Sequence, residues 1–127
     1  MKIERMIDIE DTVREALSPY ITTYCRPLPK DFTIPSILVT HVGGDDEDSI
    51  DDFAIVLDAR AETDAEANET LRNAVGILKK VAQLQTTELR HVTVNSSGSW
   101  GTDPVRPDLA MFSARLSVVT HTEIVEV

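Results

Sequence analysis

The sequence predicts an α+β fold, in which a mostly antiparallel sheet of about four to five strands carries two helices packed on one face. Two segments place apolar residues at helical spacing, and several short runs rich in β-branched residues alternate with a period of two. Aromatic residues make up only 5% of the chain, so the core must consist mainly of Val, Ile, Leu and Ala. The 127 residues fit one domain, 1–127, that can bury a core of its own.

The first helix is predicted from about Met6 to Leu17. Pro19 should end it near Leu17, because proline disfavours the helical conformation in the residue before it and lacks an amide donor. Charged residues fall between the positions of the apolar face, which is formed by Met6, Ile9, Val13, Ala16 or Leu17, and Tyr20. An amphipathic helix therefore opens the domain.

Three strands are predicted between the helices. Residues 22–25 favour a short edge strand, and a proline-rich loop separates it from two β-rich runs at 37–42 and 53–60. Gly43-Gly44 should end the first run, so the two runs are predicted to form a long antiparallel hairpin. Six of the eight residues at 45–52 are acidic, and we expect the whole tip to be exposed because unpaired buried carboxylates are costly.

The second helix is predicted to start at a capping box, in which Thr63 is followed by Glu66 three residues later. Gly76 interrupts the helix at a cost of about 1 kcal/mol relative to alanine, which close approach of a strand or neighbour could offset. One apolar face continues through it, formed by Ala67, Leu71, Ala74, Val75, Leu78, Val81 and Ala82.

Two more strands are predicted after this helix. Residues 90–96 alternate and 97–108 read as a long polar loop, rich in Gly, Ser, Asp and Pro. In 109–121 the apolar residues alternate with Ser113, Arg115 and Ser117, so one face of this strand should be buried.

The charge of the chain argues against nucleic-acid binding over its surface. Lys and Arg number 12 against 22 Asp and Glu, which gives a net charge of −10 and repels phosphate backbones. Cys25 is the single cysteine, so no intrachain disulfide forms and a reducing compartment suits the protein. No apolar run approaches the length of a membrane span, and the first ten residues do not look like a signal peptide, so we expect synthesis in a cytoplasm and no membrane partner.

Neither catalytic nor metal-binding spacing is found in the sequence. Counted from Asp46, the acidic segment places Asp51 where a calcium-binding EF-hand needs glycine. The histidines stand singly in predicted strands, without HExxH spacing, and the cysteine has no CxxC partner; these residues are His41, His91, His121 and Cys25. We therefore predict no enzyme, no catalytic or metal-binding residue and no cofactor. A small metal-binding or enzymatic domain that uses the acidic loop is the alternative from a different class.

Candidate contacts with other molecules lie in the polar segments. Trp100, in the predicted loop, is interpreted either as an interface anchor or as a side chain folded back over the sheet edge. Arg106 and Arg115 could meet the acidic hairpin of a neighbouring copy, and such a head-to-tail contact closes a ring. The hairpin residues predicted to take part are Asp45, Asp46 and Asp48.

Five landmarks follow one another along nearly the whole chain: DIEDTVREAL, RPLPKDFTIPSILV, Gly-Gly with an acidic hairpin, IVLDARAETDAEANETLRNAVGILKKV and PDLAMFSARLSVVTH. Their order resembles that of tail terminator (tail completion) proteins of tailed bacteriophages. The resemblance is one of element order, and that family offers no catalytic residues to assign to positions in this sequence.

The resemblance implies a structural protein that forms a homo-oligomeric ring, a hexamer in this family, at the head-proximal end of the tail. Such a ring caps the tail tube, ends its polymerisation and presents a surface to the neck. The implied partners are further copies of the chain, the tail tube protein and a neck or head-completion protein, while DNA passes through without specific binding. The implied location is the virion, after assembly in the host cytoplasm. The nearest alternative is another head–tail connector or neck completion protein.

Overall fold

The computed structural model describes residues 1–47, 50–104 and 106–127. Its elements, in chain order, are β1 (Lys2–Arg5), α1 (Ile9–Leu17), β2 (Thr23–Cys25), β3 (Ser36–Glu47), β4 (Ile50–Ala61), α2 (Asp64–Leu84), β5 (Leu89–Thr102), β6 (Ala110–His121) and β7 (Glu123–Glu126).

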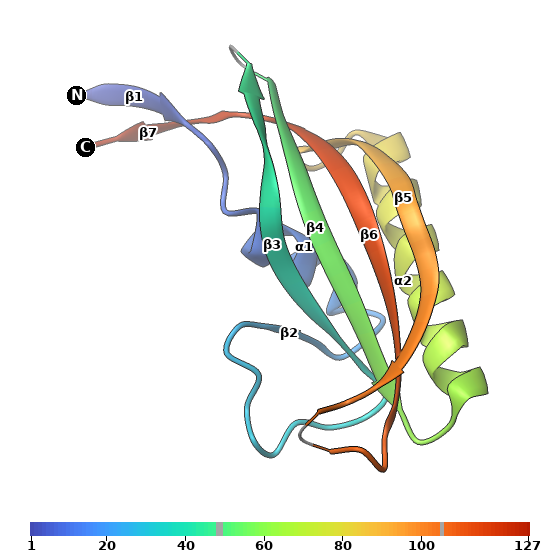
Figure 1. Ribbon diagram of the computed structural model, residues 1–127. Coiled ribbons are helices and arrows are strands. Elements are labelled where there is room, and N and C mark those ends of the chain that lie inside the picture. Colours follow the sequence, from blue (N-terminus) through green and yellow to red (C-terminus); the bar gives the residue numbers. More distant parts are fainter. Residues whose placement is uncertain (48–49, 105) are drawn as a thin grey trace.

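The main sheet has five strands in the order β2-β3-β4-β6-β5, and both helices cover one of its faces (Figure 1). Among the described strands of this sheet, only β2 is parallel to its neighbour, β3, and all other pairs are antiparallel. The predicted α+β class, with its mostly antiparallel sheet and two helices on one face, is confirmed. A second, two-stranded sheet of β1 and β7 was not predicted.

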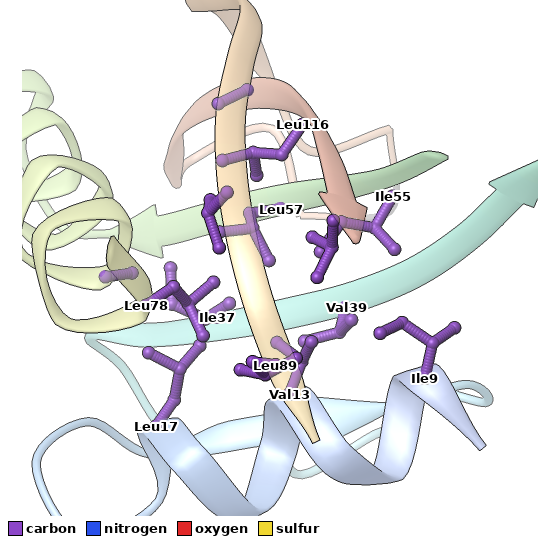
Figure 2. Packing of buried hydrophobic residues seen from close by; sticks show 14 of the residues in the cluster. Ile9, Val13, Leu17, Ile37, Val39, Ile55, Leu57, Leu78, Leu89 and Leu116 are labelled. Atoms are coloured by element: carbon purple, nitrogen blue, oxygen red, sulfur yellow. The ribbon is translucent and has the colours of Figure 1, made fainter. Parts of the chain in front are cut away.

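The core lies between the helices and the covered face of the sheet (Figure 2). Val13 and Leu17 of α1 and Leu78 of α2 are fully buried, and they meet the inward side chains of the central strands, such as Leu57 and Leu116. Aliphatic residues dominate this cluster, as the low aromatic content predicts. Burial of such side chains is the main source of stability for the fold.

The first helix is shorter than predicted. It begins at Ile9, because Asp8 caps it by accepting a hydrogen bond from the Asp11 amide at 3.1 Å, and it ends at Leu17 as expected. Met6 and Tyr20, which continue the apolar spacing, lie outside the helix and are 52% and 71% exposed. The spacing alone therefore overstated the buried face at both ends.

The second helix confirms its capping box. The Thr63 hydroxyl accepts from the Glu66 amide at 3.2 Å, and Gln85, in the left-handed conformation, caps the other end. The space around Gly76 corrects the sequence interpretation, because no described residue beyond the neighbouring backbone of α2 lies within 4 Å of where a Cβ would stand. No strand packs closely there, and Gly76 instead lines an open groove.

Gly43 and Gly44 do not end a strand, contrary to the prediction. The chain forms a β-bulge between His41 and Gly43, and β3 then continues to Glu47 in register with β4. A Cβ on Gly44 would lie 2.0 Å from the Asp52 carbonyl oxygen, and its φ of +137° disfavours other residues. Gly44 therefore lets two strands approach closely at a bend.

Residues 97–102 also belong to a strand, not to the predicted loop. Strand β5 stays paired with β6 as far as Thr102, opposite Ala110, although its register shifts at three places. Such irregularities suit an edge strand made of small polar residues. The connection to β6 is therefore short.

A buried ion pair holds this connection to the sheet. Arg60 of β4 donates from Nε to an Asp103 carboxylate oxygen at 2.7 Å, and both side chains are more than nine-tenths buried. The Arg60 guanidinium also lies 5.9 Å from the centre of the Phe32 ring, in the loop after β2. The loops before β3 and before β6 are thus joined at one end of the sheet.

Candidate assembly site

The acidic hairpin ends in two paired strands. Asp45 lies opposite Asp52, and Asp46 lies opposite Asp51, whereas Asp48 falls outside the described residues. Asp52 is exposed, but Asp51 is fully buried, so the prediction that the whole tip is exposed was wrong at this position. The reason is the alternation of β4, which turns Asp51 to the same face as the buried Phe53 and Ile55.

One edge of this hairpin has no strand beside it in the described chain. Strand β2 covers β3 only from Ile37 to Val39, and the next exposed amide, that of His41, donates to Glu10 Oε2 at 3.0 Å. Beyond that point, residues 43–47 of β3 pair, in the described chain, with β4 alone. An uncovered edge is a ready template for another strand.

Glu10 anchors α1 to the base of the hairpin. Its carboxylate accepts from Arg26 Nη2 at 2.6 Å as well as from the His41 amide. Burial alone would raise the pKa of Glu10, but these hydrogen bonds and the Arg26 charge outweigh burial and lower it below its ordinary value. Three segments of the chain therefore meet at one ionised carboxylate.

A Glu10→Gln variant should be less stable than the wild type at neutral pH by about 1 kcal/mol, because the charge-assisted hydrogen bond from Arg26 is lost. The pKa of Glu10 is lower in the folded chain, so its contribution is complete above the unfolded value, 4.5, and is lost as the pH falls through the folded pKa. Urea unfolding at pH 7 and below pH 4.5 should therefore show a gap between the two proteins that narrows in acid. Glu15→Gln, at an exposed position of the same helix, is the control. An equal gap at both pH values would contradict this role.

Trp100 lies on the edge strand β5, opposite Phe112, and not in a loop. Its indole nitrogen donates to Asp64 Oδ1, at the start of α2, at 2.9 Å. The side chain nevertheless stays 60% exposed. It thus folds over the sheet edge and still offers a large apolar surface to another molecule.

The two predicted contact arginines lie in different settings. Arg106 forms an ion pair with Asp108 at 3.0 Å, and this hydrogen-bonded neighbour lowers the pKa of the Asp108 carboxyl. Arg115 is exposed on the open face of β6, opposite Val56. The structure therefore does not bring Arg106 and Arg115 together, and their contact with a neighbouring hairpin stays a prediction.

The strands β1 and β7 form an arm that sequence reasoning missed. They pair from Lys2 with Glu126 to Arg5 with Glu123, and the arm projects from the body on the side of β3 (Figure 1). Ile124 is 71% exposed on it, and a hollow of about 480 Å³ lies at its base. The only signal in the sequence is the weak alternation of KIER and EIVE.

A second missed feature is a basic groove of about 540 Å³ between α2 and the start of β5. Its charged lining consists of Lys79, Lys80 and Arg90, with His91 beside them. Adjacent Lys79-Lys80 on the wet side of a helix, followed by Arg90-His91 at the start of the next strand, is the signal that could have revealed it.

The remaining chemically reactive side chains lie apart from each other. Burial raises the pKa of the Cys25 thiol, whose sulfur donates to the Glu10 carbonyl at 3.3 Å. The histidines are exposed on three different strands, at His41, His91 and His121. In the described part of the chain, no three His, Cys, Asp or Glu residues are grouped so that they could hold a metal ion.

No protein-family model matches the chain, and no curated protein matches its sequence. Among the described residues, no helix combines the length and apolar character needed to cross a membrane.

Proposed function

We propose that the chain is a structural protein of bacteriophage morphogenesis. It forms a ring that caps the head-proximal end of the tail tube, ends tail polymerisation and provides the surface to which the neck joins. The order of landmarks along the sequence supports the phage-tail role, and the surfaces of the fold support self-assembly.

The arm β1–β7 carries the argument for assembly. Two paired strands alone are marginally stable in water, and neither strand packs substantially on another element of the described chain. The arm nevertheless exposes Met1 and Ile124, at 78% and 71%. Both its stability and its apolar surface are accounted for when a neighbouring molecule covers it.

The five-stranded sheet supports a ring in particular. Its two sides differ: the uncovered part of β3 lies on one side and β5 lies on the other. A contact between unlike surfaces is head-to-tail, and it closes into a ring when the rotation between copies is suitable. The net charge of −10 suits a lumen through which DNA slides without sticking. An electropositive channel in the assembled particle would contradict this part of the proposal.

Deletion of the gene from the phage that encodes it should give headless tails of abnormal length, because nothing then stops tube growth. Electron microscopy of lysates measures the length distribution, and the wild-type gene supplied on a plasmid should restore uniform tails. Normal tail lengths together with leaky or tailless heads would instead identify a neck completion protein.

A further inference from the structure

The basic groove concentrates positive charge that the rest of the described chain does not neutralise. Within residues 1–47, 50–104 and 106–127, no ion pair includes Lys79, Lys80 or Arg90. The guanidinium of Arg90 is held by the backbone carbonyls of Thr87 and Leu89, the latter at 3.2 Å, so its charge is fixed at the groove. In a chain of net charge −10, this arrangement favours an acidic ligand.

The acidic end of the β3–β4 hairpin lies at the same level of the sheet as this groove. Across the strands, Asp46 is opposite Asp51, Asp51 is opposite Thr120, and Thr120 is opposite Leu89, the first residue of β5. Three strand spacings, about 14 Å, separate β3 from β5. The hairpin and the groove therefore lie at the same position along the strand direction, but on opposite sides of the same molecule.

We infer that the groove between α2 and β5 receives the acidic hairpin end of a second copy of the chain. The inference rests on the proposed self-assembly and names its interface. When copies stand side by side and are related by rotation about an axis parallel to the strands, every hairpin and every groove lies at the same position along that axis. The hairpin of one copy therefore meets the groove of the next. Opposite charges then face each other at each contact.

Strand direction agrees with this arrangement. Strand β3 runs toward the hairpin end of the sheet, whereas β5 starts there and runs away from it. Side-by-side copies therefore bring antiparallel edges together, and residues 42–47 of β3 have no other strand on that side in the described chain. Backbone hydrogen bonds between the edges would add to the charge contacts.

Charge reversal with a complementary partner tests the inference. One variant carries Lys79→Glu and Lys80→Glu, and the other carries Asp45→Lys, Asp46→Lys, Glu47→Lys and Asp52→Lys, which reverses the net charge of residues 45–52 and leaves the buried Asp51 unchanged. Each variant alone should raise the concentration at half-assembly by at least about tenfold, because like charges meet at every contact. Mixed in equal amounts, the two should assemble again, since each hairpin then finds a groove of opposite sign. Native mass spectrometry measures assembly, and complementation of the gene deletion measures tail length, with the variants supplied singly and together.

Lys30→Glu with Arg72→Glu is the matched control, because it changes the net charge as much as the groove variant does, at two other exposed positions. Unimpaired assembly and tail length with the groove variant, or no recovery on mixing, would overturn the inference while leaving the proposed function intact. Normal tails after deletion of the gene would overturn the proposed function itself.

A DNA-binding measurement tests the other possible ligand of the groove. Binding of a short DNA duplex at physiological salt that is lost in the groove variant would show that the groove serves a phosphate backbone instead.

Discussion

Replacement of Leu57 by alanine should lower the free energy of unfolding by about 3 to 4 kcal/mol, a large part of the total for a domain of this size. Leu57 is fully buried on β4, between Val39 of β3 and Ala114 of β6, and it faces the helices (Figure 2). Truncation would leave a cavity among buried neighbours, and the surrounding structure can collapse into it only in part. Urea unfolding monitored by circular dichroism measures the loss.

Val56→Ala is the matched control for this prediction. Val56 adjoins Leu57 but points to the open face of the sheet, where it is only partly buried. The control should cost about 1 kcal/mol, because less apolar surface leaves water contact on folding. Equal losses in the two variants would mean that the helices do not cover the face that contains Leu57.

A Gly44→Ala variant should lose about 2 to 3 kcal/mol of stability, or detach the acidic end of the hairpin to avoid that cost. The new methyl group would stand 2.0 Å from the Asp52 carbonyl oxygen, and the backbone would have to keep a φ of +137°. Both obstacles involve backbone atoms, which cannot rotate away as a side chain does. Urea unfolding measures the first outcome, and faster amide exchange in 44–47 and 50–53 reveals the second.

Gly76→Ala makes the same chemical change in α2 and should act in the opposite direction. Apart from the neighbouring backbone of α2 itself, no atom of the described residues lies within 4 Å of the new methyl group, so alanine should stabilise the helix by about 0.5 to 1 kcal/mol.

The Gly44→Ala prediction has its own contrary outcome: wild-type stability and exchange rates in Gly44→Ala would show that the bend at the bulge does not need glycine. If the hairpin of Gly44→Ala detaches, that variant should also fail to assemble, because the groove of the next copy then loses its ligand.

The helices and the central strands were predictable because their signals are local. The box of Thr63 and Glu66 acts within one helical turn, and the alternation around Leu116 follows from the pleat of a strand. Pro19 likewise marked the end of α1 correctly. In each case neighbouring residues decide the conformation, so a short window of sequence contains the cause.

The errors share a different origin, because distant partners decide those segments. Gly43-Gly44 is a common turn signal, but here β4 continues alongside and turns the pair into a bulge. The polar residues before Trp100 form a strand because β6 offers them an edge. The arm joins residues more than a hundred positions apart, which no local pattern reveals.

Prediction of the candidate site from the sequence was limited in the same way, as the acidic hairpin shows. Composition indicates a solvated tip, yet the pleat turns Asp51 inward beside Thr120. The basic groove was missed because α2 and β5 each contribute part of its lining, and only the helix-to-sheet packing brings Lys80 near Arg90. Charge clusters formed by two elements become visible only when the elements are placed.

The buried pair of Arg60 and Asp103 has a consequence for a ring of these molecules. It closes one end of the sheet with loops, while the other end carries the hairpin and the groove. Rotation about an axis parallel to the strands puts all closed ends on one face and all open ends on the other. The proposed ring would therefore have two unlike faces. Only one of these faces would suit the tube, which leaves the other for a different partner, as the proposed role at the end of the tail requires.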